Sequence, residues 1–308
     1  MRIVYLGTPD FAVKPLEKLI EKGYEIVAVC TNKDKPVGRK QVLTPCPVKQ
    51  VALNYRIKVF QYDKIRIEGV DDLKSLNADL FITCAFGQIL SQEILDIPKY
   101  GTFNIHGSLL PKYRGASPIQ WSVLNGDKIT GITVMRTDIG IDTGDIIYQQ
   151  KVDIEENETS GELFEKLSVL GADCIVKTLE LLEQGKIEYK KQDDENATLT
   201  KMLKKEDAEI DFNRTCDEVH NFVRGMNPWP VAFIKYNGEV LKIFKTTKGV
   251  LTGVPGQVLK ADSKIGLEVA TKTGSVVIKE IQKPGSKKMD IADFLRGNKI
   301  NEGDFLGK

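Results

Sequence analysis

The sequence has few cysteines and no long apolar run, and each shortage excludes a class of protein. Its five cysteines lie far apart among 308 residues and form no C-x-x-C pair, which argues against a disulfide framework and a structural zinc site. The nearest approach to a membrane span, residues 78–90, is interrupted by Thr83 and Gly87 and is shorter than the roughly 18 residues required. The first residues also lack the apolar stretch of a signal peptide. We therefore expect a cytoplasmic protein.

Two nucleotide-binding signatures are absent as well. The first expected turn from strand to helix reads Gly7-Thr8-Pro9-Asp10. It does not match G-x-G-x-x-G, and no G-K-[ST] follows it, so neither the dinucleotide fingerprint nor a P-loop is present. These absences argue against an enzyme that uses a nicotinamide cofactor or ATP.

Neither sign of charge dominates the chain. Its 44 Lys and Arg residues against 43 Asp and Glu give a net charge of +1, and apolar residues make up 41%. This composition is that of a folded globular protein rather than a disordered chain. The charge is uneven along the chain, because residues 201–308 carry 19 basic against 14 acidic residues. Either nucleic-acid contact or ordinary surface variation accounts for that excess.

The first half of the sequence alternates short apolar runs with helical stretches. This alternation predicts βαβ units, and therefore a Rossmann-like α/β fold with a mainly parallel sheet and helices on both faces. Ligands of such sheets usually bind near the carboxyl ends of the strands. The expected strands are residues 2–6, 25–31, 58–61, 80–84, 102–106 and 130–137, and the expected helices are residues 10–22, 48–55, 70–76 and 91–95.

The second half has a different pattern. A long helix is expected over residues 159–184, and a shorter one over 216–224 with His220 on its surface. About five short β-branched runs separated by glycines follow between residues 231 and 282, which predicts a small OB-like β-barrel. Residues 190–209 are dense in charge and resemble a linker. We expect domains over residues 1–189 and 207–308, joined by a linker over 190–206.

The candidate catalytic residues begin with Asn104 and His106. They lie two apart in an expected strand and therefore share one face. An Asn amide can donate to a developing oxyanion, and a His can move a proton near neutral pH. Gly107 follows and allows close backbone approach. The structural alternative is a capped strand end with a histidine whose hydrogen bonds are satisfied.

A second candidate is the loop Asp138-Ile139-Gly140-Ile141-Asp142-Thr143-Gly144-Asp145. Its three acids and two glycines do not match the EF-hand pattern, and the bidentate Glu is missing. A tight loop that presents one carboxylate is the better interpretation. The spacing alone leaves open whether that carboxylate meets Asn104 and His106.

Two motifs of the chain resemble the folate-dependent formyltransferases: N-I-H-G-S-L-L-P-K-Y-R-G at residues 104–115 and D-I-G-I-D-T-G at 138–144. Four further features resemble the members of this family that act on methionyl-tRNA. They are the motif at residues 7–11, the loop at 34–39 with 45–49, the segment N-P-W-P at 227–230, and the C-terminal barrel. The resemblance implies 10-formyltetrahydrofolate as donor, the α-amine of methionyl-initiator-tRNA as acceptor, and no metal. We further expect a monomer.

The same resemblance implies roles for individual residues. Asn104 and His106 would stabilise the oxyanion, and Asp142 would orient His106 and shuttle a proton. The implied folate-binding residues are Ser108, Leu109, Leu110, Pro111, Phe86, Gly87, Gln88, Ile89, Asp138, Ile139 and Gly140.

A basic cluster lies between an expected strand and helix, at Lys33, Lys35, Arg39 and Lys40. Such clusters are usually solvated loops, but the resemblance implies contact with the tRNA acceptor stem, with Arg39 foremost.

Two other functions compete with formyl transfer to methionyl-tRNA. The first is a formyltransferase acting on a nucleotide sugar or glycinamide ribonucleotide, and the second is a folate- or RNA-binding module with a vestigial site.

Overall fold

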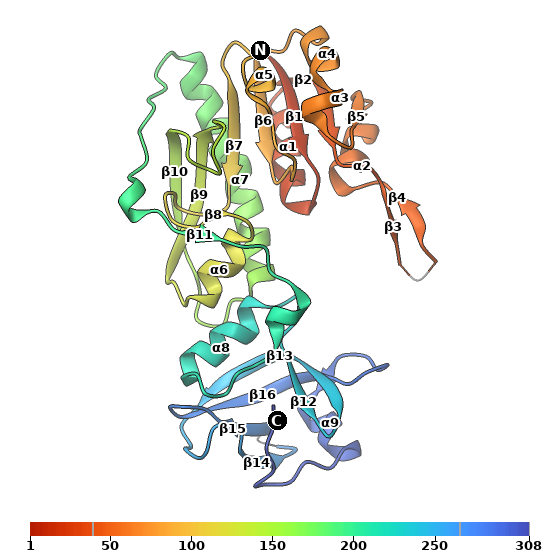
Figure 1. The fold of residues 1–308 in the computed structure, drawn as a ribbon, viewed down its shortest axis with the longest axis vertical. Coiled ribbons are helices and arrows are strands. Elements are labelled where there is room, and N and C mark those ends of the chain that lie inside the picture. Colours follow the sequence, from red (N-terminus) through yellow and green to blue (C-terminus); the bar gives the residue numbers. More distant parts are fainter. Residues whose placement is uncertain (39, 265, 308) are drawn as a thin grey trace. The chain divides into compact units, whose positions relative to one another are not determined.

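The computed structural model describes residues 1–38, 40–264 and 266–307, which form two compact units (Figure 1). The first unit contains Met1–Gly115, Thr130–Val152 and Phe164–Leu199. The second contains Ala116–Ile129, Asp153–Leu163 and the chain from Thr200 onward. The units interleave along the chain, whereas the sequence-based domains are consecutive runs.

A seven-stranded sheet forms the centre of the first unit, in the order β10-β9-β7-β6-β1-β2-β5. Five neighbouring strands pair in parallel, and β9 pairs antiparallel to β7. The predicted, mainly parallel sheet is therefore confirmed. The strands are β1 (Arg2–Gly7), β2 (Glu25–Thr31), β5 (Val59–Gln61), β6 (Leu80–Cys84), β7 (Thr102–His106), β9 (Ile129–Arg136) and β10 (Ile146–Asp153).

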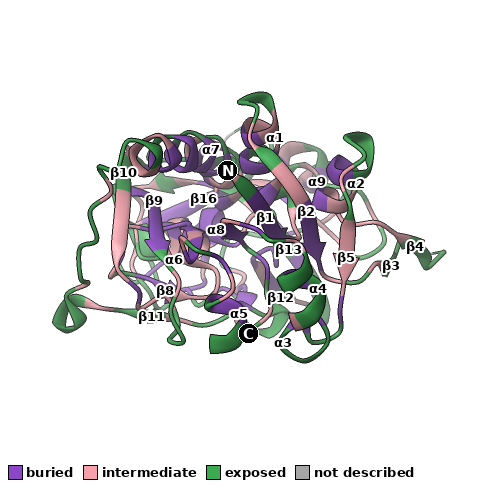
Figure 2. Ribbon diagram, turned by 90° about the horizontal axis from the view of Figure 1, so that it is seen from above, coloured by how far each residue is buried: buried purple, intermediate pink, exposed green. Residues whose placement is uncertain are grey.

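Helices cover both faces of this sheet because its central strands are apolar on both sides. Val4 of β1 packs in a cluster with Ile65, Leu73 and Ile94 from one set of helices. On the other face the Tyr5 hydroxyl donates to the Ala12 carbonyl at 2.7 Å. The buried central strands appear purple in Figure 2. The helices are α1 (Val13–Glu21, after the 3-10 turn Asp10–Ala12), α2 (Pro47–Asn54), α3 (Ile65–Glu68), α4 (Val70–Ser75), α5 (Gln92–Leu95) and α7 (Ser160–Glu183).

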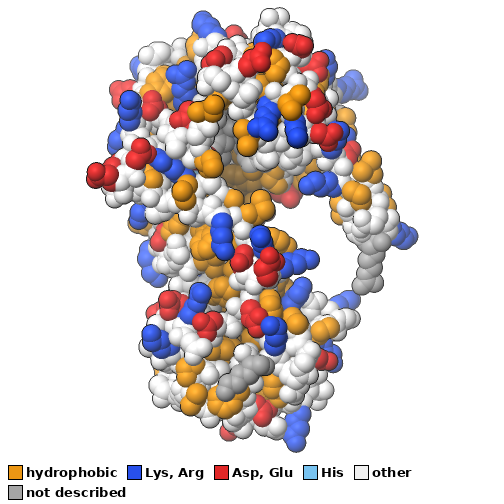
Figure 3. Space-filling model, in the orientation of Figure 1, with side chains coloured by type: hydrophobic (Ala, Val, Ile, Leu, Met, Phe, Trp, Pro, Cys, Tyr) orange, Lys and Arg blue, Asp and Glu red, His pale blue; other side chains and the backbone are white. Residues whose placement is uncertain are grey.

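Of the described residues of the basic cluster, Lys35 lies in the first strand of a hairpin, Lys40 lies between its two strands, and Lys33 precedes it. Strands β3 (Lys35–Val37) and β4 (Val42–Thr44) pair antiparallel, with Val37 opposite Val42. Val37, Val42 and Leu43 are more than half exposed, and apolar side chains stand out on this hairpin in Figure 3. The two β-branched residues favour strands, but the prolines and glycine nearby conceal that signal in the sequence.

The second unit is built on an antiparallel sheet in the order β12-β13-β16-β15-β14, with β17 beside β16. The sheet curls into a half-barrel, as expected of an OB-like domain (Figure 1). Three elements of this unit, α6, β17 and α9, are not among those expected from the sequence. The elements are α6 (Pro118–Leu124), α8 (Cys216–Gly225), β12 (Phe233–Tyr236), β13 (Glu239–Gly249), β14 (Val258–Asp262), β15 (Gly266–Ala270), β16 (Ser275–Gln282), β17 (Met289–Asp290) and α9 (Ile291–Gly297).

The expected position of His220 is wrong. It lies on the buried side of α8, only 2% exposed, and its Nδ1 is 3.0 Å from the Thr246 hydroxyl. The amphipathic pattern of α8 places Val219, His220 and Val223 together against the core of the second unit. Burial lowers the pKa of His220, and the nearby Arg224 and Lys248 act in the same direction.

The charged segment that resembles a linker has regular structure at several points. It contains β11 (Leu199–Thr200) and 3-10 turns at Asp194–Asn196 and Lys205–Ala208. Strand β11 pairs with β8 (Arg114–Gly115). In the described part of the chain, no helix is long and apolar enough to cross a membrane.

Candidate active site

Strand β7 and the loop between β9 and β10 bring three predicted residues together. Asn104 and His106 share one face of β7, and Asp142 lies on the loop. His106 Nδ1 is 3.6 Å from Asp142 Oδ2, and Asn104 Nδ2 is 3.5 Å from Asp142 Oδ1. The structure thus answers the question that sequence spacing left open, because the loop carboxylate does meet both side chains.

His106 is held in one tautomer by the backbone. Its ring is buried, and Nε2 lies 2.9 Å from the Tyr113 carbonyl oxygen. A carbonyl can only accept a hydrogen bond, so Nε2 must carry the proton. The expected donation from His106 to an oxyanion therefore cannot use Nε2 while this bond persists. Nδ1 is the nitrogen that faces Asp142.

The amide of Asn104 is oriented by a residue that sequence analysis missed. Thr83 pairs with Asn104 in the β6–β7 register, and its hydroxyl donates to Asn104 Oδ1 at 2.9 Å. Because the oxygen accepts from Thr83, the amide nitrogen points toward Asp142 and can donate. Thr83 and Asn104 are 21 residues apart in the sequence. The role of Thr83 could therefore be predicted only from the register in which the two strands pair.

The D-x-G-x-D-T-G spacing has a structural reason. Asp138 Oδ1 accepts from the Gly140 amide at 3.0 Å and from the Thr143 hydroxyl at 2.7 Å, which closes the loop on itself. A Cβ on Gly144 would collide with the Arg136 carbonyl. Asp142 adopts a φ of 53°, and its Oδ2 accepts from the Gly115 amide at 2.8 Å. These contacts present a single carboxylate to His106.

The predicted folate segment, residues 108–111, is tied into the protein. The Ser108 hydroxyl is buried and donates to the Lys112 carbonyl at 2.6 Å. The Leu110 amide donates to the Thr133 hydroxyl, and the Leu110 carbonyl accepts from the side chain of Gln149. Leu109 and Pro111 are only partly buried. In this structure Ser108 and Leu110 therefore shape the backbone of the segment.

The other predicted folate residues divide into buried and exposed groups. Phe86 is buried, and the Gln88 amide donates to Asn32 Oδ1 at 2.8 Å. Ile89 and Ile139 are 69% and 74% exposed, and Gly87, Asp138 and Gly140 are exposed beside them in sequence. Ile89 and Ile139 thus expose apolar side chains on two loops of the first unit.

The basic cluster is only partly available to a partner. Lys33 is paired with Asp63 at 2.5 Å, while Lys35 and Lys40 are exposed. Arg39 lies outside the described residues. An ion pair of 2.6 Å between Lys49 and Asp34 lies where the hairpin joins α2.

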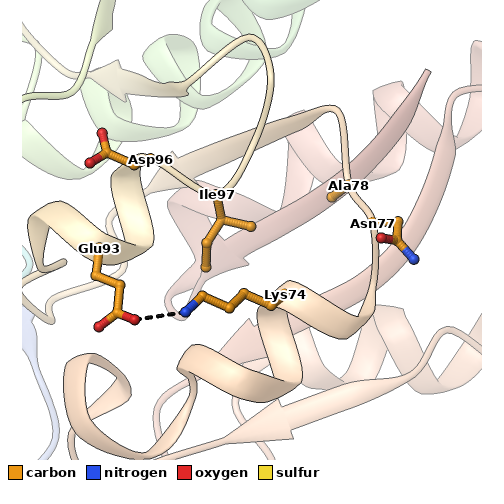
Figure 4. Close-up of a pocket in the computed structure, with 6 residues that line it drawn as sticks. All are labelled: Lys74, Asn77, Ala78, Glu93, Asp96 and Ile97. Atoms are coloured by element: carbon orange, nitrogen blue, oxygen red, sulfur yellow. Dashed lines mark hydrogen bonds and ion pairs between the residues drawn. The ribbon is translucent and has the colours of Figure 1, made fainter.

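A separate depression lies near the start of β6, at the amino end of the sheet (Figure 4). Lys74 and Glu93 form an ion pair of 2.7 Å across it. None of the predicted site residues lines it, so it is distinct from the cluster at Asn104, His106 and Asp142. Its lining residues are Lys74, Asn77, Ala78, Glu93, Asp96 and Ile97.

Comparison with known proteins identifies the family. A model described as formyl transferase matches residues 1–179, and one described as formyl transferase, C-terminal domain, matches residues 202–299. The chain belongs to the formyl transferase family. A relative named methionyl-tRNA formyltransferase, from Geotalea uraniireducens (strain Rf4), is 45% identical over 100% of this chain and 98% of its own. Another of that name, from Agathobacter rectalis, is 46% identical over 99% of both chains.

Solved structures of formyltransferases share the fold. The sugar 3N-formyltransferase WlaRD, solved in the presence of dTDP and 5-N-formyl-THF, has a TM-score of 0.70 at 24% identity and covers 93% of this chain and 99% of its own. A methionyl-tRNA formyltransferase from Clostridium thermocellum has a TM-score of 0.58 at 21% identity and covers 80% and 93%. At these identities the likeness establishes the fold of this formyl transferase, and its substrates rest on other observations.

Proposed function

We propose that this formyl transferase moves a formyl group from 10-formyltetrahydrofolate to the α-amine of methionyl-initiator-tRNA. The observation that carries the proposal is the contact of Asn104, His106 and Asp142 in one cluster. The full-length match to relatives named methionyl-tRNA formyltransferase favours this acceptor over a nucleotide sugar or glycinamide ribonucleotide. The intact cluster argues against a binding module with a vestigial site.

The proposed chemistry requires a donor for the oxyanion. An amine attacks the formyl carbon, and negative charge develops on the formyl oxygen. The Asn104 amide is suited to this role because Thr83 occupies its oxygen and leaves the N–H groups to donate. Preorganised donors of this kind supply about 2.7–4 kcal/mol of barrier reduction.

The reaction also requires proton transfer, since the attacking nitrogen loses a proton and the leaving N10 of the folate gains one. An α-amine with a pKa of about 7.7–8.0 is partly neutral at pH 7. His106 Nδ1 and Asp142 face each other across 3.6 Å, which is longer than a hydrogen bond. Catalytic contacts often tighten only when substrate binds. We infer that the proton moves through Nδ1, because Nε2 donates to Tyr113.

For the folate we propose the exposed loops of the first unit. Ile89, Ile139 and the backbone around Gly87 and Gly140 would contact the ring, with Leu109 and Pro111 beside them. Ser108, Leu110, Phe86 and Gln88 would shape this surface from within, because their polar groups or side chains are already engaged or buried.

For the tRNA we propose contacts from the β3–β4 hairpin and from the second unit. The basic residues of the second unit would bind tRNA phosphates. Exchange of Lys35 or Lys40 for Ala should lower the log–log salt slope of tRNA binding by about 0.7–0.9 for each phosphate that is no longer neutralised. Lys33→Ala should have a smaller effect because Asp63 already pairs with that ammonium. If the salt slopes of all three variants equalled that of the unaltered protein, the hairpin would not be part of the tRNA-binding surface. Arg39 remains a predicted contact.

The deciding experiment supplies the purified protein with 10-formyltetrahydrofolate and either initiator or elongator methionyl-tRNA. Formylation of the initiator form well above the elongator form is expected. Formylation of a nucleotide sugar with neither tRNA modified would overturn the proposed acceptor. Sedimentation of the same sample tests the expected monomer.

A further inference from the structure

The segment 192–198, which we call the crossing segment, reaches the catalytic cluster from far along the sequence. It belongs to the first unit, and it lies in the stretch 180–201 that neither family model matches. Its composition resembles a linker. Two of its residues nevertheless make hydrogen bonds to the two loops that support Asp142 and His106.

Gln192 bridges the catalytic loop. Its Nε2 donates to the carbonyls of Asp142 and Gly144 at 2.8 and 2.7 Å. Its Oε1 accepts from Arg114 Nε and Nη2 at 3.0 and 2.9 Å. A guanidinium can only donate, so Arg114 fixes which end of the amide faces the loop. The amide thus holds the backbone on both sides of Thr143, and with it the position of the Asp142 carboxylate.

Thr198 supports the histidine in a similar way. Its hydroxyl accepts from the Tyr113 amide at 2.8 Å, and its own amide donates to the Pro111 carbonyl. Tyr113 adopts a φ of 62°, which is uncommon for a bulky residue and persists only where neighbours hold it. The Tyr113 carbonyl is the group that accepts from His106 Nε2. Thr198 therefore holds the peptide that fixes the tautomer of His106.

We propose that Gln192 and Thr198 are positioning residues for formyl transfer, acting on Asp142 through its loop and on His106 through Tyr113. The proposal rests on the proposed function. His106 and Asp142 stand 3.6 Å apart and must approach for proton transfer. A displacement of about 1 Å in such a pair can cost about 10²-fold in rate. The substrates do not need to touch either residue for this effect.

The test compares two variants with a matched control. Gln192→Glu keeps an acceptor for Arg114 but turns a carboxylate oxygen toward two carbonyls, and Thr198→Val keeps the shape of the side chain but removes the hydroxyl. The control, Asp194→Asn, lies in the same segment and also contacts Arg114, with a side chain that is 82% exposed. We expect kcat to fall about 10–100-fold in the two variants, with KM for both substrates nearly unchanged. The control should behave as the unaltered protein.

A second measurement does not depend on turnover. The chain has only two histidines, so NMR spectra of isotope-labelled histidine resolve both rings. Both variants should shift the His106 signals and leave those of His220 in place. If Gln192→Glu fails to fold, Thr198→Val alone decides.

Several outcomes would overturn the proposal. These are an unchanged kcat, a rise in KM without a fall in kcat, or unmoved His106 signals in folded variants. Absence of formylation by the unaltered protein would instead count against the proposed function, and the histidine spectra would still test the positioning.

Discussion

The two histidines of the chain lie in regions that are alike in burial and differ in what surrounds the ring. His106 and His220 are 6% and 2% exposed, and each has both ring nitrogens near a polar atom. His106 faces a carboxylate on a tight loop. His220 instead meets a hydroxyl and a carbonyl, with Arg224 and Lys248 nearby.

Under the proposed function, this difference separates a ring placed to exchange a proton with a carboxylate from a ring that packs within a core. A carboxylate beside a ring can accept a proton from an imidazolium, whereas neighbouring cations disfavour the imidazolium form of a histidine. If burial were the only criterion, His220 would be as good a candidate for a catalytic residue as His106. The partner of the ring is therefore the more useful criterion, and the variants below test it from the largest effect to the smallest.

The sharpest test replaces Asn104 and Asp142 of the cluster that contains His106, and compares the result with replacement of His220. Asn104→Ala and Asp142→Asn should each lower kcat by about 100-fold or more, since each removes a donor or a proton carrier. His220→Gln should leave kcat within about threefold. Steady-state kinetics and circular dichroism on all three variants provide the measurement. Retention of more than about a tenth of kcat by either first-unit variant would contradict the assigned roles.

A matched pair of threonines divides activity from stability. Thr83→Val removes the donor to Asn104 Oδ1, and Thr246→Val removes the partner of His220 Nδ1. Both leave a polar atom without its partner, so each should cost about 1–3 kcal/mol of unfolding free energy. Only Thr83→Val should also lower kcat, by about tenfold, because the Asn104 amide can then rotate.

Thermal unfolding and kinetics on the same samples check this pair. Equal values of kcat in the two variants would mean that Thr83 does not orient Asn104. A decrease in the activity of Thr246→Val at a temperature where it is fully folded would mean that the His220 region contributes to turnover.

The sequence predicts the sheet of the first unit well because its central strands are continuous apolar runs, as in residues 3–6. It also identifies Asn104, His106 and Asp142 as candidates. It does not identify Thr83, because that contact depends on strand register, nor the Tyr113 carbonyl, because a backbone group leaves no mark on the sequence. Gln192 lies 78 residues beyond Arg114 in a stretch whose charge density indicates solvent exposure. Contacts of this range arise only from the folded chain.

The smallest expected effect is the pH dependence of stability caused by His220. Its pKa is lowered in the folded protein, chiefly by burial, relative to about 6.5 in an unfolded chain. The unfolded state therefore binds more protons than the folded state below that value. The contribution of His220 to the unfolding free energy should be largest above pH ~6.5. It should decline as the pH falls toward the lowered pKa of the folded state, by up to about 1.4 kcal/mol per pH unit. Glu156, whose carbonyl faces the ring, moderates the decline, while Arg224 and Lys248 reinforce it.

Denaturant titrations between pH 5 and 8 of the unaltered protein and His220→Gln measure this contribution. The variant lacks a titrating ring and should show a shallower decline below pH ~6.5, and the difference between the two curves isolates His220 from the carboxylates. Parallel curves would mean that the ring takes up its proton equally in both states, and the contrast with His106 would then rest on catalysis alone. A difference of opposite sign would mean that the folded protein stabilises the imidazolium of His220. That result would contradict the expected effect of burial and of Arg224 and Lys248, all of which lower the pKa of this ring.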